Sequence, residues 1–344
     1  MSCHEIQKEN QANNFTLLRL LLALAVVLGH YKTLPGNAYT PIFTFADLAV
    51  DMFFIISGYL ITWSWDKNPE PKGYFIRRFF RIYPLYLFII LTQTAAMLAA
   101  LYQKTGDFSL IQPGNLLRYL GANLVFANFL ARDIGDLFGQ MHVPGVNASL
   151  WTLKIEVGFY LVLPLIWAAF KRWGLGVFAA IFVLSSLYYM GMEHLHKETL
   201  AKQLPGLLRF FVVGMAFYAY QHKVKLGQLQ STLLAAATFT LLYLCRYQDW
   251  FFVFYPLCVG LFVFLFTLRL PALPLSFDIS YGVYLLHAPL IQFAQLYGLL
   301  SDTTGFLLML LAAVITLALL AERWIERPGI EWGKKICRQL KAGA

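Results

Sequence analysis

The stretch that decides the fold is TGFLLMLLAAVITLALLAERW, residues 304–324, in which no charged residue precedes Glu322. An uncharged apolar run of this length is typical of a transmembrane helix, which needs about 20 residues to cross the hydrocarbon core of a bilayer. Nine further apolar segments predict helices of the same kind, so we expect about ten spans in all. These segments cover residues 14–33, 45–65, 76–101, 148–170, 175–192, 204–221, 230–246, 250–268 and 279–298.

The composition indicates the same fold class. Of the 344 residues, 59% are hydrophobic and 13% are charged, whereas a typical soluble domain has about 25% charged residues. A soluble enzyme, a disordered chain and a disulfide scaffold are therefore excluded, and we expect an all-α polytopic membrane protein in a lipid bilayer. Every loop is short except residues 102–147, in which we expect an interfacial or re-entrant piece at 115–130, so residues 1–344 are expected to form a single transmembrane domain.

The distribution of charge predicts the orientation. The net charge is +9, which in a soluble protein would suggest a nucleic-acid partner, but here we interpret the cations as cytoplasmic anchors. With a cytoplasmic N-terminus, 17 of the 27 Lys and Arg residues lie on the cytoplasmic side, 7 lie outside and 3 fall within spans. We therefore expect both termini to be cytoplasmic, a location in the inner (cytoplasmic) membrane, and no nucleic-acid partner. The four cysteines have no disulfide or metal-site spacing, so no metal is expected.

The first span contains two ionisable residues, Arg19 and His30, which are costly inside a membrane. They are eleven residues apart, so they share a helix face and lie about 16 Å apart along the axis. In the predicted orientation His30 lies in the outer half of the span and Arg19 in the cytoplasmic half. A structural alternative is open, in which Arg19 reaches the headgroups and His30 makes an interhelical hydrogen bond.

Two carboxylates are expected at the depth of His30. Asp51 and Glu156 lie in the second and fourth spans, both of which would run inward from the outer side. Three ionisable residues from three helices in one layer indicate a polar cavity. A carboxylate that orients a histidine is a minimal general base, so His30 with Glu156 or Asp51 is a candidate catalytic group. The nearby Ser57–Gly58 pair is typical of a close helix contact.

A cluster of arginines lies between the second and third spans, in DKNPEPKGYFIRRFFRIYP, residues 66–84. Arg77, Arg78 and Arg81 alternate there with aromatic residues that include Tyr83. Guanidinium groups bind phosphate oxygens in pairs, and an adenine ring can stack on aromatic side chains or on arginine. The segment therefore predicts a binding site for a cytosolic, nucleotide-containing donor; a topology anchor is the alternative.

Two groups near the C-terminus are interpreted as structural. His287 lies within the ninth span and shares a helix face with Tyr284, and we favour a hydrogen-bonding role for it. The last span ends in charged residues that we interpret as salt-bridged anchors at the cytoplasmic interface, with Pro328 expected to stop the helix. These anchors are Glu322, Arg323, Glu326 and Arg327.

Six motifs, in order along the chain, resemble the membrane-bound acyltransferase-3 family. They are Arg19-x10-His30, VDMFFIISGYLI, Arg78 to Arg81 followed by Ile-Tyr-Pro, SLWTLKIEVGFYLVLPL, ISYGVYLLH and IERP. The resemblance implies a helical membrane O-acyltransferase with about ten spans. It would move an acyl group, commonly acetyl from acetyl-CoA, to a hydroxyl of an envelope or exported sugar of a glycan or glycolipid.

The resemblance also implies roles for individual residues. His30 matches the catalytic histidine and Arg19 its partner, while Asp51 and Glu156 match acidic positions of the family. Arg78 and Arg81 match the arginines that bind the phosphates of coenzyme A in the family. No fused periplasmic hydrolase-like domain is expected.

Two other function classes are alternatives to an acyltransferase. A proton-coupled transporter could use His30, Asp51 and Glu156 as a proton relay, and a non-catalytic membrane scaffold would need none of them. The sequence leaves several points open. They are the acceptor, the acyl group, the choice between direct transfer and an acyl-histidine intermediate, the oligomeric state and the role of His287.

Overall fold

The structure is a computed structural model that describes residues 13–36, 45–106 and 112–342. These residues form helices and no strand, as the apolar runs predict. The helices are α2 (Phe15–Thr33), α3 (Ala46–Lys67), α4 (Pro71–Thr105), α5 (Pro113–Leu124), α6 (Trp151–Trp173), α7 (Gly176–His194), α8 (Glu198–Ala201), α9 (Leu204–Tyr220), α10 (Gln228–Cys245), α11 (Tyr255–Leu268), α12 (Ser280–Leu296), α13 (Thr304–Ala321) and α14 (Arg327–Ala342).

The predicted membrane spans each coincide with a helix. Eight helical segments of the described chain are long and apolar enough to cross a bilayer, so the protein is an integral membrane protein. The other two predicted spans correspond to α11 and α12, which have 14 and 17 residues. The count of ten spans and the cytoplasmic location of the termini stay predictions.

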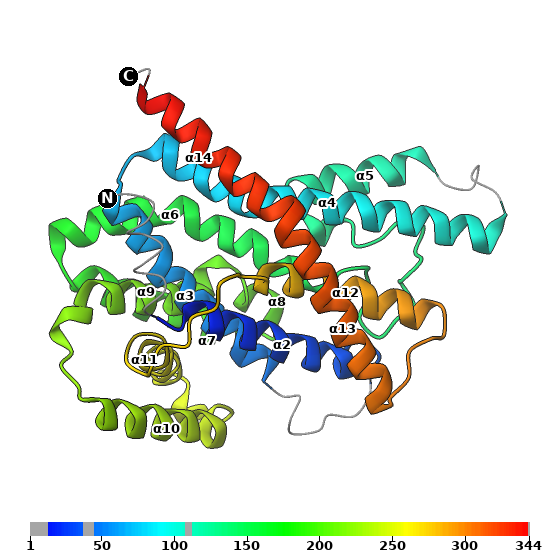
Figure 1. Ribbon diagram of the computed structural model, residues 1–344. Helices are drawn as coiled ribbons and strands as arrows, with labels where there is room; N and C mark the ends of the chain where they lie inside the picture. The colour runs from blue at the N-terminus through cyan, green and yellow to red at the C-terminus, as the bar shows by residue number, and fades with distance from the viewer. Residues whose placement is uncertain (1–12, 37–44, 107–111, 343–344) are drawn as a thin grey trace. The chain divides into compact units, whose positions relative to one another are not determined.

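The prediction that Pro328 stops the last span is wrong. Helix α13 continues through a π-helical turn, Glu322–Glu326, directly into α14, as Figure 1 shows. In this turn the N–H of Arg327 bonds the carbonyl of Glu322, five residues back. The wider turn shifts the hydrogen-bond register just before Pro328, so that the helix accommodates a residue without an N–H.

Contacts divide the chain into two compact units, neither of which is a continuous stretch. Unit 1 comprises residues 1–22, 47–70 and 155–277, and unit 2 comprises residues 23–46, 71–154 and 278–344. Helix α2 contributes its N-terminal part to unit 1 and its C-terminal part to unit 2. The single-domain prediction is not tested by this division and stays a prediction.

Within unit 1, α3 and α9 cross at two glycines. A Cβ atom on Gly58 would lie 2.1 Å from the carbonyl oxygen of Phe211, and one on Gly214 would lie 2.1 Å from that of Ile55. No side chain fits between the two backbones at this crossing. The contact that the Ser57–Gly58 pair indicated is therefore a backbone-to-backbone contact of the kind that small residues allow in membrane proteins.

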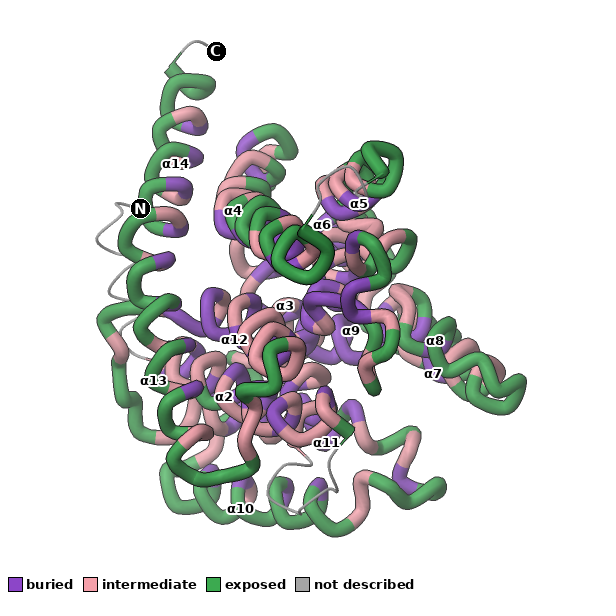
Figure 2. The backbone as a smooth tube through the Cα atoms, turned by 90° about the vertical axis from the view of Figure 1, so that its right-hand side faces the viewer, coloured by how far each residue is buried: buried purple, intermediate pink, exposed green. Residues whose placement is uncertain are grey.

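Within unit 2, α14 lies along α4 (Figure 1). Its buried residues, Gly329, Gly333 and Cys337, recur every four positions and so form one stripe. Gly329 and Gly333 lie against Pro84 and Phe80 of α4. Figure 2 shows the result: one side of α14 is buried and the other is exposed.

We predict that Gly58→Ala lowers thermal stability, because the added methyl group would push α3 away from α9. Overpacking of this kind costs about 1–3 kcal/mol. The matched control is Gly191→Ala on α7, where a Cβ atom would have no neighbour within 4 Å. The melting temperature of the protein in detergent is the measurement, and equal values for the two variants would contradict the prediction.

Candidate active site

The centre of the candidate site is a pair of histidines in unit 2. Nδ1 of His30, near the end of α2, lies 2.8 Å from Nε2 of His287 in the middle of α12. The ring centroids are 5.0 Å apart, and His287 is fully buried. The structure thus brings His30 together with a residue for which the sequence favoured only a structural role.

The surroundings of His287 determine which nitrogen carries each proton. Nδ1 of His287 lies 3.0 Å from the carbonyl oxygen of Val283. A carbonyl oxygen can only accept, so Nδ1 of a neutral His287 bears the proton and its Nε2 is an acceptor. His30 then donates from Nδ1, and the lone pair of its ring lies on Nε2. A neutral histidine with its lone pair on a defined nitrogen is able to act as a general base.

Neighbouring residues fix α12 at this position. Asn147 donates from Nδ2 to the carbonyl of Leu285 at 3.1 Å, and Gln292 donates from Nε2 to the carbonyl of Gly145 at 2.9 Å. Both bonds tie the loop before α6 to the buried side of α12. Ser149 follows this loop, with its Oγ 3.4 Å from Nε2 of His287.

The two carboxylates that the sequence predicted beside His30 are found in unit 1 with other partners. Glu156 accepts a hydrogen bond from the hydroxyl of Tyr160, one turn further along α6, at 2.6 Å. Asp51 accepts one from the hydroxyl of Tyr255 at 2.7 Å. The catalytic roles of Asp51 and Glu156 stay predictions.

Asp51 also has a buried cation near it that the sequence analysis counted only as a charge within a span. Arg209 of α9 is 3% exposed and interacts electrostatically with Asp51. Its guanidinium carbon lies 4.0 Å from the ring centroid of Tyr189 and 4.3 Å from that of Phe252. These contacts stabilise a charge that would otherwise be costly in a membrane.

Arg81 is held by two carboxylates of unit 2. Its Nη1 lies 2.8 Å from Oε2 of Glu326 in the π-helical turn, and its Nη2 lies 3.0 Å from Oδ2 of Asp278 just before α12. The side chain of Glu326 is 1% exposed. Asp278 also accepts from the backbone N–H and the hydroxyl of Ser280, at 3.2 and 2.6 Å. Arg81 therefore joins three helical segments, and the anchoring role expected of Glu326 is exerted through Arg81.

The other members of the arginine cluster lie on the first turns of α4. The guanidinium carbon of Arg78 lies 5.9 Å from the ring centroid of Tyr74, and Arg77 precedes it on the same helix. Tyr83 stacks on Phe79 with 4.6 Å between ring centroids, and its hydroxyl donates to the carbonyl of Leu124. Roles of these residues in donor binding are not tested by their positions.

Arg19 lies on α2 in the part that belongs to unit 1, and His30 lies in the part that belongs to unit 2. The helix is continuous between them, so they share a face about three turns apart, as their spacing predicted.

Within the described ranges, no group of three or more His, Cys, Asp or Glu side chains could hold a metal ion.

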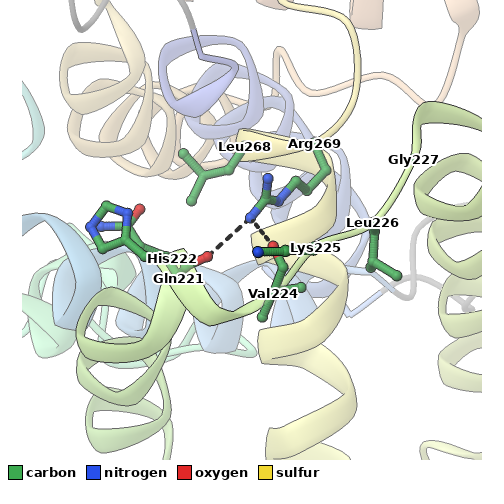
Figure 3. A pocket seen from close by; sticks show the side chains of 8 residues that line it. All are labelled: Gln221, His222, Val224, Lys225, Leu226, Gly227, Leu268 and Arg269. Atoms are coloured by element: carbon green, nitrogen blue, oxygen red, sulfur yellow. Dashed lines mark hydrogen bonds between the residues drawn. The ribbon is translucent and has the colours of Figure 1, made fainter.

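A basic cavity of about 620 Å³ occurs in unit 1 at the turn between α9 and α10 (Figure 3). His222, Lys225 and Arg269 are among its lining residues. Nη2 of Arg269 donates to the carbonyls of Gln221 and Val224, at 3.0 and 2.6 Å. Two bonds to the backbone indicate that Arg269 stabilises this turn.

Comparison with known proteins assigns the family. Residues 13–322 match the model of the acyltransferase domain Acyl_transf_3. The chain belongs to the acyltransferase-3 family. The histidine pair and the arginine cluster therefore lie within an acyltransferase-3 domain, as the six sequence motifs indicated. No solved structure matches the chain.

Several curated relatives are similar to parts of this acyltransferase-3 chain. Nodulation protein 10 of Rhizobium leguminosarum bv. viciae is 30% identical over 171 residues, which cover 47% of this chain and 46% of that protein. The O-acetyl transferase of Shigella phage Sf6 is 27% identical over 61% of this chain and 63% of its own length. Peptidoglycan O-acetyltransferase OatA of Listeria monocytogenes is 26% identical over 51% of this chain and 29% of its own length. The chain thus spans less than two thirds of these relatives.

We predict that Arg81→Ala strongly destabilises the protein, because it leaves the buried Glu326 without its cation. Removing one member of a fully buried pair costs about 3–5 kcal/mol, and we expect less here because the side chain of Arg81 is 26% exposed. Arg78→Ala, one turn earlier on the same helix, removes a guanidinium that lies over the ring of Tyr74, and it is the control that is expected to cost less stability. The double variant Arg81→Met with Glu326→Gln should recover part of the loss.

Thermal unfolding in detergent, followed by tryptophan fluorescence, compares the four proteins. Equal melting temperatures for Arg78→Ala and Arg81→Ala would contradict a structural role for the pair of Arg81 and Glu326.

Proposed function

We propose that the protein is a membrane O-acyltransferase that moves an acyl group, commonly acetyl, from a coenzyme A thioester to a hydroxyl of an envelope or exported sugar. Membership of the acyltransferase-3 family supports the reaction class, and two relatives are named O-acetyltransferases. The observation that carries the mechanism is the hydrogen bond from Nδ1 of His30 to Nε2 of His287.

In the proposed mechanism His30 is the general base. Its Nε2 takes the proton of the acceptor hydroxyl as the oxygen attacks the thioester carbonyl. The carbon–sulfur bond then breaks, and His30 returns the proton to the departing thiolate, so that no net proton is gained or lost. His287 accepts from Nδ1 of His30 throughout. That bond strengthens when His30 becomes positively charged, since charge-assisted hydrogen bonds are stronger than neutral ones.

His287 takes the part that the sequence analysis gave to Asp51 or Glu156. The orienting group of a catalytic histidine keeps the imidazole in one tautomer and one rotamer. Here the orienting groups would be neutral. The carbonyl of Val283 orients His287, and His287 orients His30, and all three residues belong to unit 2. Asp51 and Glu156 remain candidates for polar residues that line the interior of the membrane domain.

We assign donor binding to the arginine cluster. Arg77 and Arg78 would contact the phosphates of the donor from the first turns of α4, and the stacked pair of Phe79 and Tyr83 offers an aromatic surface for its adenine ring. Arg81, fixed by its two carboxylates, would hold this part of α4 in place. Arg19 would act as the partner of His30 from the same face of α2. The donor would enter from the cytosol, with both termini on that side of the inner membrane.

We predict that His30→Ala lowers kcat for acetyl transfer at least 100-fold, because positioned general bases contribute about 100- to 10,000-fold. The assay follows release of the coenzyme A thiol and incorporation of label from radioactive acetyl-CoA by protein in lipid nanodiscs. The melting temperature confirms that the variant is folded. Normal transfer by a folded His30→Ala protein would overturn the base assignment. Proton-coupled transport would leave the thioester intact.

We predict that His287→Ala also lowers kcat, by roughly tenfold or more, because the tautomer of His30 is then no longer fixed. His287→Gln is the matched variant, since its Oε1 can accept a hydrogen bond near the position of Nε2, and it should restore part of the rate. KM for acetyl-CoA should not change in either variant. If Ala and Gln at position 287 gave the same kcat, an orienting role for His287 would be refuted.

A further inference from the structure

The basic cavity at the turn between α9 and α10 has no part in the proposed reaction. Its volume of about 620 Å³ is within the range of small-molecule sites, which are about 300–1,000 Å³. Six of its lining residues come from the turn at 221–227, and the other two are Leu268 and Arg269 at the end of α11 (Figure 3). All of them belong to unit 1, and none belongs to the six motifs.

The basic cavity lies at a membrane surface. The helical segments Glu198–Lys223 and Gln228–Cys245 are both long and apolar enough to cross a bilayer, so the turn that joins them lies where the lipid headgroups are. In the predicted orientation this is the cytoplasmic surface, whose leaflet contains anionic lipids. Lipid headgroups are therefore within reach of the cavity.

The charge of the basic cavity is positive. His222 and Lys225 are exposed side chains that can reach a ligand, and Arg269 adds its charge from within the turn that it stabilises. None of the lining residues is acidic. Between residues 199 and 277 the sequence contains a single acidic residue, Asp249, which precedes α11 and so lies at the opposite end of that helix from Arg269. The cavity therefore favours an anion.

One carboxylate of unit 1 occurs near this end of α9, and it has partners of its own. Asp66, at the end of α3, accepts a hydrogen bond from the hydroxyl of Tyr218 at 2.9 Å, three residues before Gln221. It also forms an ion pair with Lys171, with 3.2 Å between Nζ and Oδ1. The negative charge of Asp66 is thus matched by Lys171 and leaves the positive charge of the cavity in place.

An apolar surface begins beside the basic cavity. Helix α10 starts at Gln228, directly after the last lining residue of the turn. Leu229 and Leu233 lie one turn apart on one face of α10 and are 72% and 61% exposed. Lipid chains can cover such leucines, whereas a free phosphate ion would make no use of them. The combination of a basic cavity and this apolar face favours a lipid over a soluble anion.

We propose that the basic cavity binds the phosphate-containing headgroup of an anionic phospholipid. Lys225 and His222 contact the phosphate oxygens, and the acyl chains lie against Leu229 and Leu233. Basic pockets between transmembrane helices are suited to such headgroups. Because the cavity is lined by residues that follow α9 and α11 and precede α10, a bound lipid joins the ends of these helices and stabilises the folded protein. This site is separate from the proposed reaction and does not depend on it.

The test compares lipids of different headgroup charge. The protein is placed in nanodiscs of phosphatidylcholine that contain increasing fractions of phosphatidylglycerol. Native mass spectrometry reports which lipid stays bound on release from the nanodisc, and thermal unfolding reports stabilisation. Inorganic phosphate and acetyl-CoA, each added to nanodiscs of phosphatidylcholine alone, are the soluble phosphate probes.

The variant of the cavity is His222→Gln with Lys225→Gln, which leaves the bonds of Arg269 to the turn intact. The matched control is His194→Gln with Lys197→Gln. It changes the same residue types at the same spacing, at exposed positions of unit 1 outside the cavity.

We expect the wild-type protein to retain phosphatidylglycerol in preference to phosphatidylcholine and to melt at a higher temperature when phosphatidylglycerol is present. The cavity variant should need about fivefold more phosphatidylglycerol for half occupancy, which is the usual effect of one lost cation beside an anionic lipid. The control variant should bind phosphatidylglycerol as the wild type does.

Two results would overturn the proposal. If the wild type retains both lipids equally, or if the cavity variant and the control retain phosphatidylglycerol equally well, the basic cavity is not a headgroup site. If inorganic phosphate or acetyl-CoA stabilises the wild type in phosphatidylcholine, and the cavity variant alone loses this effect, the cavity binds a soluble phosphate compound instead of a lipid.

Discussion

The hydrogen bond between His30 and His287 joins residues 257 positions apart in the chain. Inside a membrane no water replaces a lost partner, so each polar side chain fixes the position of the group that satisfies it. The bond to the carbonyl of Val283 orients His287, and His287 orients His30. The register of α12 against the end of α2 therefore determines the chemistry available at His30.

The same constraint acts at the arginine cluster. Glu326 is buried in the π-helical turn that follows the apolar α13, and Arg81 pairs with it. The π-helical turn at Glu322–Glu326 is what carries the glutamate to that position before α14 continues along α4. The two ion pairs of Arg81 thus join α4, the start of α12 and the junction of α13 with α14.

The fold was predictable from the sequence because hydropathy and helix length are local properties. The ten apolar segments all coincide with helices, and the Ser57–Gly58 pair indicated a close contact that the structure has at Gly58. The partners within the site were not predictable in the same way. The predicted depth in the membrane puts His30 in the same layer as Asp51. Depth does not determine how each helix is rotated about its own axis or which helices are adjacent.

Two features of the structure show what a local interpretation of the sequence omits. Proline normally ends a helix, yet the turn before Pro328 is of π type, and nothing in the residues ERWIE states that. For His287 the sequence favours a hydrogen-bonding role, and the structure gives it hydrogen bonds, but the sequence does not name the partner. The ISYGVYLLH motif held the signal, since a buried ionisable residue at mid-span needs a specific partner, and the partner was His30.

Helix α12 connects two parts of the proposed reaction. Asp278, which binds Arg81, lies just before its first turn, and His287 lies near its middle. From Ser280 to His287 is seven residues, or about 10 Å along the axis. The first half of one helix thus separates the arginine that holds α4 from the histidine pair. A donor bound at the arginine cluster would have to reach His30 over a distance that α12 fixes.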